Sequence, residues 1–167
     1  GIKAANSLAM LGNTVLFLGS SDIGDNGVFM IKDSTITRVS TNDIEREINL
    51  LADKENAYSS IWQEHQHLFY SLTFEASKVT YVYDISEGAW HNRSSFDSSN
   101  KQTFWRYNNA TFAYGKIYVG TNGALCYLDE NVFTEHDGMP ILKLRRGSVL
   151  TNDGLPFYID AAEIITN

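Results

Sequence analysis

Short apolar runs alternate with polar turns along most of the chain, and a unit of four such runs recurs about every fifty residues. Each unit begins with an apolar run, a tight polar turn and a second apolar run. These first halves are "LAMLGNTVLFLGS" (8–20), "SSIWQEHQHLFYSLTF" (59–74) and "TFAYGKIYVGT" (111–121). Each unit continues with a strand, an Asp-led turn and another strand. These second halves are "GVFMIKDSTITRVS" (27–40), "KVTYVYDISEGAWHNRS" (78–94) and "GALCYLDENVFTEH" (123–136).

Four short antiparallel strands repeated at this period are typical of a kelch-like propeller blade. The sequence therefore predicts an all-β, β-propeller-like fold with about three four-stranded antiparallel blades. We place the blades at about 7–40, 58–94 and 104–136.

The stretch "YVYDISEGAWHNRSS" (81–95) contains one of these turns. If its loop runs from Ile85 to Gly88, Tyr83 lies directly opposite Trp90, and such a cross-strand aromatic pair contributes roughly 0.2–1 kcal/mol. Gly88 can adopt the positive φ that closes the turn, and Asp84 can accept backbone N–H bonds within it. The pattern thus predicts a structural hairpin.

The same turn recurs in the other two units with different side chains. Asp129 leads it in the third unit, where Phe133 takes the place of Trp90, and Asp33-Ser34 is a shorter version in the first. We therefore interpret the acidic and histidine side chains of 84–91 as part of the architecture rather than as a catalytic loop.

One segment, "STNDIEREINLLAD", interrupts the β-pattern. Its apolar residues fall at i, i+4 and i+7, on one face of a helix. We predict a short helix over about 43–52, with Asn42 and Glu45 as a capping box. The apolar face consists of Ile44, Ile48 and Leu51.

Two polar or mixed segments lie outside the predicted blades. The stretch "SSFDSSNKQT" (94–103) is expected to be a loop between blades, and further strands are expected within 140–165. The chain has no initiator Met, and we expect it to be an excerpt of a longer protein.

Composition limits the possible functions. The 167 residues fit a single domain, and 13% aromatic residues favour strands. A net charge of -7 argues against nonspecific nucleic-acid binding, which needs clustered Lys and Arg. The single Cys126, in "ALCYL", excludes an internal disulfide framework and is expected to be an inert thiol in a buried strand. The sequence contains no run of eighteen apolar residues, so no membrane span is predicted.

Two motifs resemble metal sites. "EHQH" would place His65 and His67 on one strand face if it stayed extended, but it coincides with a predicted hairpin tip and lacks a third strong ligand. "DIGDNG" places Asp22 as in a calcium loop, but Gly24 stands at the third position and the bidentate Glu is missing. We predict no metal and no cofactor.

Catalytic motifs are absent from the sequence. No G-x-S-x-G, H-E-x-x-H or phosphate-cradling glycine loop occurs, so we predict that the protein is not an enzyme. A fragment of a glycosidase remains an alternative, because paired carboxylates meet only in the fold.

An ordered series of motifs resembles the β-propeller region of the phage stabilisation protein family. The series is a "VLFLG" strand, a Gly-bounded loop, an "RVST" strand entering a helix, a "HLFYSLTF" strand and "YVYD", followed by a Gly and "WHNRSS". The resemblance covers about residues 7 to 125. It implies a non-catalytic virion protein that sits below the portal and adaptor ring of a short-tailed phage. There it would help to retain packaged DNA and provide attachment for the tail needle and tailspikes.

Partner binding is expected at the corners of the blades. We also expect self-association, because a partial propeller leaves two open flanks. The alternative is a glycan- or protein-binding kelch-like module, which exposed Trp side chains over a groove would favour. The predicted partner-binding residues are Asp22, Asp25, His65, His67, Glu87, Asn92, Arg145 and Arg146.

Overall fold

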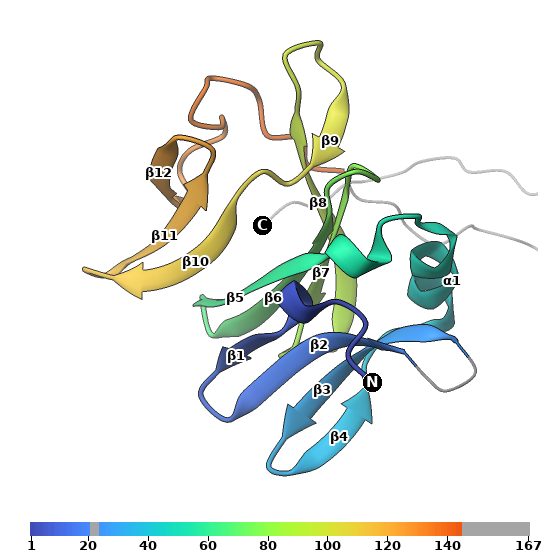
Figure 1. Ribbon diagram of the computed structural model, residues 1–167. Helices are drawn as coiled ribbons and strands as arrows, with labels where there is room; N and C mark the ends of the chain where they lie inside the picture. Colours follow the sequence, from blue (N-terminus) through green and yellow to red (C-terminus); the bar gives the residue numbers. More distant parts are fainter. Residues whose placement is uncertain (21–23, 145–167) are drawn as a thin grey trace, which may run out of the picture.

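The computed structural model describes residues 1–20 and 24–144, which form three antiparallel sheets that follow one another along the chain (Figure 1). Sheet 1 contains β1 (Ala9–Leu11), β2 (Thr14–Ser20), β3 (Asn26–Lys32) and β4 (Thr35–Arg38). Sheet 2 contains β5 (Tyr58–Glu64), β6 (His67–Phe74), β7 (Val79–Asp84), β8 (Ala89–Phe96) and β9 (Gln102–Phe104). Sheet 3 contains β10 (Asn108–Ala113), β11 (Lys116–Thr121) and β12 (Ala124–Tyr127).

The first strands of the three sheets lie side by side. Residues 9–11 of β1, 60–63 of β5 and 109–112 of β10 line one groove of about 740 Å³. In Figure 1 the three strands run toward the same side of the molecule. The hairpin turn after each of these strands therefore emerges at the same end of the molecule. Neighbouring blades of a propeller have this arrangement around their axis. The prediction of an all-β, propeller-like organisation is confirmed.

The predicted division into three four-stranded blades is correct only for sheet 1. The expected loop at 94–103 is wrong, because β8 continues to Phe96 and β9 pairs with it. Asp97 turns the chain between them by accepting the backbone N–H groups of Ser99 and Lys101, both at 2.9 Å. Sheet 2 therefore has five strands.

Within the described residues, sheet 3 has three strands, and the fourth strand predicted before His136 does not form. Asp129 does lead a turn, since it accepts the N–H of Asn131 at 3.0 Å. Phe133, however, is 63% exposed and lies in no strand. The chain instead folds back on itself, with the Glu135 N–H donating to the Met139 carbonyl at 2.7 Å. Further strands were expected within 140–165. Up to residue 144, this segment forms only an isolated bridge between Thr134 and Pro140. Residues 145–165 lie outside the described residues.

The helix forms close to its expected position, but its cap differs. α1 spans Asn42–Leu50 and packs against sheet 1, with Ile48 fully buried. The N-cap is Thr41, whose Oγ1 accepts the Ile44 N–H at 3.4 Å, so the predicted capping box is wrong. Glu45 does not reach back to the cap because Arg38 holds both of its carboxylate oxygens, at 2.5 and 2.6 Å.

Sheet 2 is buried on both faces. One core cluster fills the space toward sheet 1 and includes Leu16, Tyr70 and Leu72. A second cluster fills the space toward sheet 3 and includes Trp62 and Val82. Cys126, predicted to be buried, is half-buried at the edge of this second cluster.

The hairpin at 85–88 has the predicted register. Tyr83 lies opposite Trp90 with ring centroids 5.0 Å apart, and Gly88 has a φ of 68°. Asp84 Oδ1 accepts the N–H groups of Ser86 and Glu87, at 2.9 and 3.2 Å. The shorter turn of sheet 1, Asp33-Ser34, also has positive φ at both residues.

The substitution Gly88→Ala is expected to lower the free energy of unfolding by about 1 kcal/mol, because a Cβ is disfavoured at positive φ. An added Cβ would meet only Tyr83 Oη at 3.8 Å, so the cost is conformational. Gly120→Ala is the matched control, since its Cβ would make ordinary contacts at 3.6 Å and its φ is not positive. Urea unfolding of both variants measures the difference, and equal stabilities would contradict the assigned turn.

Candidate interaction site

Polar side chains gather where the two hairpin turns of sheet 2 meet. His67 Nδ1 lies 2.7 Å from Asp84 Oδ2, so both oxygens of Asp84 are engaged. Ser86 Oγ accepts the Leu68 N–H at 3.1 Å and donates to the Gln66 carbonyl at 3.4 Å. The serine hydroxyl is therefore used to join the two turns, and it makes no hydrogen bond with His67.

The Asp84 carboxylate is held in its charged form. Burial alone would raise its pKa, but the hydrogen bond with His67 and the N–H groups of Glu87 and Ser86 lower the pKa below its usual value. The group thus acts as a charged turn-forming residue.

The structure does not bring the predicted partner-binding residues together. His65 has a φ of 46° in the β5–β6 turn, and its Nε2 pairs with Glu130 Oε2 at 3.3 Å. His65 and His67 therefore have different carboxylate partners and do not share a strand face. Glu87 and Asn92 are exposed on the β7–β8 hairpin, and Asp25 is exposed on the loop before β3. Asp22, Arg145 and Arg146 lie outside the described residues.

Among the residues that the structure describes, no three His, Cys, Asp or Glu side chains are grouped as metal ligands would be. The predicted role of these exposed residues in partner binding stays a prediction.

A cleft of about 890 Å³ lies between sheets 2 and 3. Residues 91–94 of β8 form one wall, and residues 125–130, at and after β12, form the other. Trp105 and Tyr107, between β9 and β10, also line it. Sequence reasoning missed this cleft, because its walls belong to separate repeat units.

Arg93 is the central charged group of the cleft. Its guanidinium carbon lies 5.0 Å from the ring centroid of Trp62, 5.2 Å from Trp105 and 5.5 Å from Phe69. The nearest carboxylate oxygen belongs to Glu64, at 3.9 Å. Cation–π contacts of this kind stabilise a largely desolvated guanidinium. The same positive charge, together with burial, lowers the pKa of His91, with burial the larger cause.

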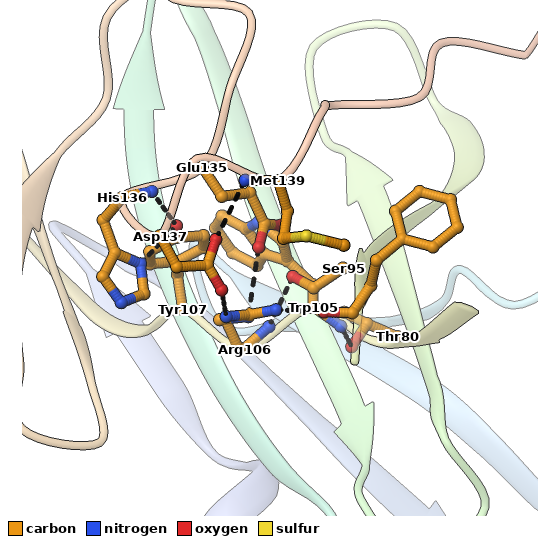
Figure 2. Close-up of polar contacts among 10 residues, drawn as sticks. Thr80, Ser95, Trp105, Arg106, Tyr107, Glu135, His136, Asp137 and Met139 are labelled. Carbon is orange, nitrogen blue, oxygen red and sulfur yellow. Dashed lines mark hydrogen bonds and ion pairs between the residues drawn. The ribbon is translucent and has the colours of Figure 1, made fainter. Parts of the chain in front are cut away.

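A second arginine, Arg106, anchors the segment at the mouth of the cleft (Figure 2). It pairs with Asp137 and donates to the Phe96 carbonyl, and its Nε lies 3.1 Å from Glu135 Oε2 without hydrogen-bond geometry. Tyr107 Oη accepts the backbone N–H of residue 136 at 3.3 Å. These contacts fix the 135–139 turn against β8.

The pKa values of the two carboxylates in this network are shifted in opposite directions. Burial raises the pKa of Glu135, whose side chain is 4% exposed, although Arg106 partly opposes the shift. Burial would also raise the pKa of Asp137, but the hydrogen bond and the charge of Arg106, together with the N–H of Met139, lower it below its usual value. Arg106 is therefore shared between a desolvated and a solvated acid.

Comparison with known proteins identifies the family of this chain. The family model described as "Bacteriophage P22 Gp10, beta-propeller" matches residues 1–133. The chain belongs to this phage stabilisation family. The match confirms the resemblance noted over about 7–125 and extends it at both ends. No curated protein gives a significant match to the chain.

Membership of the phage stabilisation family makes this chain a bacteriophage structural protein with a virion location. The matched region contains all three sheets and the hairpin at 85–88. No helix in the described parts of the chain is long and apolar enough to cross a membrane.

The substitution Asp84→Asn is expected to destabilise the protein at neutral pH by about 1–2 kcal/mol, because charge-assisted hydrogen bonds are lost. The folded-state pKa of Asp84 is depressed, so its contribution is complete above the unfolded pKa of about 3.9 and disappears as the pH falls through the lower folded value. The stability difference between wild type and variant should therefore shrink below about pH 4.

Chemical denaturation at a series of pH values measures this dependence. Glu87→Gln, an exposed acid in the same turn, is the control for removal of a charge. A stability difference between wild type and Asp84→Asn that persists at pH 2 would contradict the role of the Asp84 charge.

Proposed function

We propose that this protein is a non-enzymatic structural component of a phage tail or head-to-tail hub. In this role it stabilises packaged DNA by helping to close the exit channel, and it provides attachment for other tail proteins. The partners are the portal or adaptor ring, the tail needle and the tailspike. The family match over residues 1–133 carries this proposal.

The outer face of sheet 1 supports a role in assembly. Met10, Val15, Ile31 and Ile36 are successive cross-strand partners, so they form one apolar row across the sheet. Met10 is 64% exposed and Ile36 is 65% exposed. Beside this row, Phe17 and Phe29 stack at 5.8 Å. A contiguous exposed apolar patch marks a protein interface rather than a solvated surface.

The tryptophans favour a structural role over glycan binding. Trp62 and Trp105 are 3% and 6% exposed and pack between sheets 2 and 3. Trp90 is half-buried, and its Nε1 donates to the Val39 carbonyl at 2.9 Å. Sugar stacking needs open ring faces, whereas these rings join the sheets.

The protein is expected to bind tail components in a pull-down assay. The tagged protein is incubated separately with purified portal–adaptor complexes, tail needle and tailspike, and stoichiometric retention of at least one is expected. Ile36→Lys should reduce retention at least about tenfold if the sheet 1 face is the contact, because a buried lysine at an interface is strongly unfavourable.

Leu50→Lys, at an 82% exposed position on α1, is the control and should bind normally. Absence of binding to any virion component by a protein with native circular dichroism would overturn the proposed function.

The protein is also expected to self-associate through its open flanks. Analytical ultracentrifugation should show a weight-average mass that rises with concentration, and Ile36→Lys should shift this rise to higher concentration. A single monomeric species over a hundredfold range of wild-type concentration would contradict this expectation.

A further inference from the structure

Sheet 3 ends in an unpaired strand edge. Within the described residues, β12 pairs only with β11, whereas the third strands of sheets 1 and 2 are each followed by a paired fourth strand. The Leu128 N–H donates to the Ile117 carbonyl at 2.9 Å, so these two residues form a hydrogen-bonded pair of the β11–β12 ladder. Hydrogen-bonded and non-hydrogen-bonded pairs alternate along an antiparallel ladder, so every second residue of β12 from Leu128 bonds to β11. It follows that the N–H and C=O groups of Leu125 and Tyr127 point away from β11.

This unpaired edge lies in the cleft between sheets 2 and 3. Residues 125–127 are part of one wall, and residues 91–94 of β8 are part of the other. Sheets 2 and 3 are neighbours in the fold (Figure 1). Leu125, with its side chain 74% exposed, adds apolar surface beside the edge. The strand itself, Ala124–Tyr127, carries none of the charged residues or prolines that protect natural edges from pairing.

The carboxylates that line the cleft already have partners. Glu64 accepts a hydrogen bond from Trp62, Glu130 pairs with His65, and Glu135 pairs with Arg106. A fourth, the turn-leading carboxylate at position 129, accepts the backbone N–H of residue 131.

The cationic side chains that line the cleft lie against aromatic rings. Arg93 contacts three aromatic rings and has its nearest acid at 3.9 Å, and Lys143 lies 5.3 Å from the ring of Phe133. Because the ion pair of Arg93 with Glu64 is this long, its guanidinium fork can still bind a second carboxylate.

We propose that this cleft binds an extended segment of another polypeptide, which adds to the edge of β12 as a fourth strand. The backbone of the segment pairs with Leu125 and Tyr127, its apolar side chains fill the cleft, and an Asp or Glu side chain binds Arg93. Only a second backbone offers alternating donors and acceptors at the spacing of a strand. The inference goes beyond the proposed function, since it requires no particular position in the virion.

A synthetic strand tests the proposal directly. The probe is the hexapeptide acetyl-Val-Thr-Val-Glu-Val-Thr-amide, titrated into the isotopically labelled protein and followed by NMR. Saturable one-to-one binding is expected, and the amide hydrogens of Leu125 and Tyr127 should exchange at least about tenfold more slowly in the complex. A peptide with proline at its central valine should not bind, because proline cannot donate to the ladder.

Charge recognition is tested with a second peptide and a matched pair of variants. A peptide with Gln in place of Glu should bind at least about fivefold more weakly to wild type, because a charge-assisted bond is lost. Arg93→Gln should remove this preference while still binding the Gln peptide. Arg46→Gln, at a position on α1 with a 73% exposed side chain, should retain the preference.

Four results would overturn the proposal. They are no binding of the acidic peptide to folded protein, equal binding of the proline peptide, unchanged exchange at Leu125 and Tyr127, and an unaltered Glu preference in Arg93→Gln. Protection of these two amides that grows with protein concentration, without peptide, would assign the edge to a second copy instead. Loss of tail binding in the pull-down would leave these peptide results unaffected, so the two failures are distinguishable.

Discussion

The burial of sheet 2 on both faces is the constraint on which the rest of the structure depends. Side chains alternate along β7, so Tyr81 and Tyr83 enter the core toward sheet 1 while Val82 enters the core toward sheet 3. Neither flank can be removed without exposing one of these cores to water. Sheets 1 and 3, in contrast, each have one covered and one uncovered face. The middle sheet thus joins the two cores, and only the outer two sheets leave a face uncovered.

Charged groups in this fold serve mainly to shape connections and close cores. Asp84 and Asp97 accept backbone N–H groups in turns, and Arg106 fastens a turn to a strand through two acids. Arg93 differs from these residues, since its charge is surrounded by rings and its acidic partner, Glu64, lies 3.9 Å away. This difference is why the cleft between sheets 2 and 3, rather than the hairpin with Asp84, is the site that we assign to a ligand.

Local features were predictable from the sequence, and contacts between repeat units were not. The loop at 85–88 follows from neighbouring residues, so its register and the Tyr83–Trp90 pair were predicted correctly. The turn at Asp97 is also local, and its Asp-Ser-Ser-Asn composition is typical of a hairpin turn, so this strand pair was predictable although the prediction of a loop was wrong. The rings around Arg93 come from strands and segments up to 43 residues apart, at Trp62 and Trp105, and no sequence periodicity relates them.

The common direction of β1, β5 and β10 gives the molecule two unlike ends. One end carries the tight turns, cross-linked by side chains such as Asn13 to Asp33 at 2.5 Å and Ser86 to Gln66. The other end carries the returns between second and third strands, such as the one at 75–78. An assembly built from such units has a top and a bottom by construction. Proteins that bind at the two ends would therefore meet different chemistry on the same subunit.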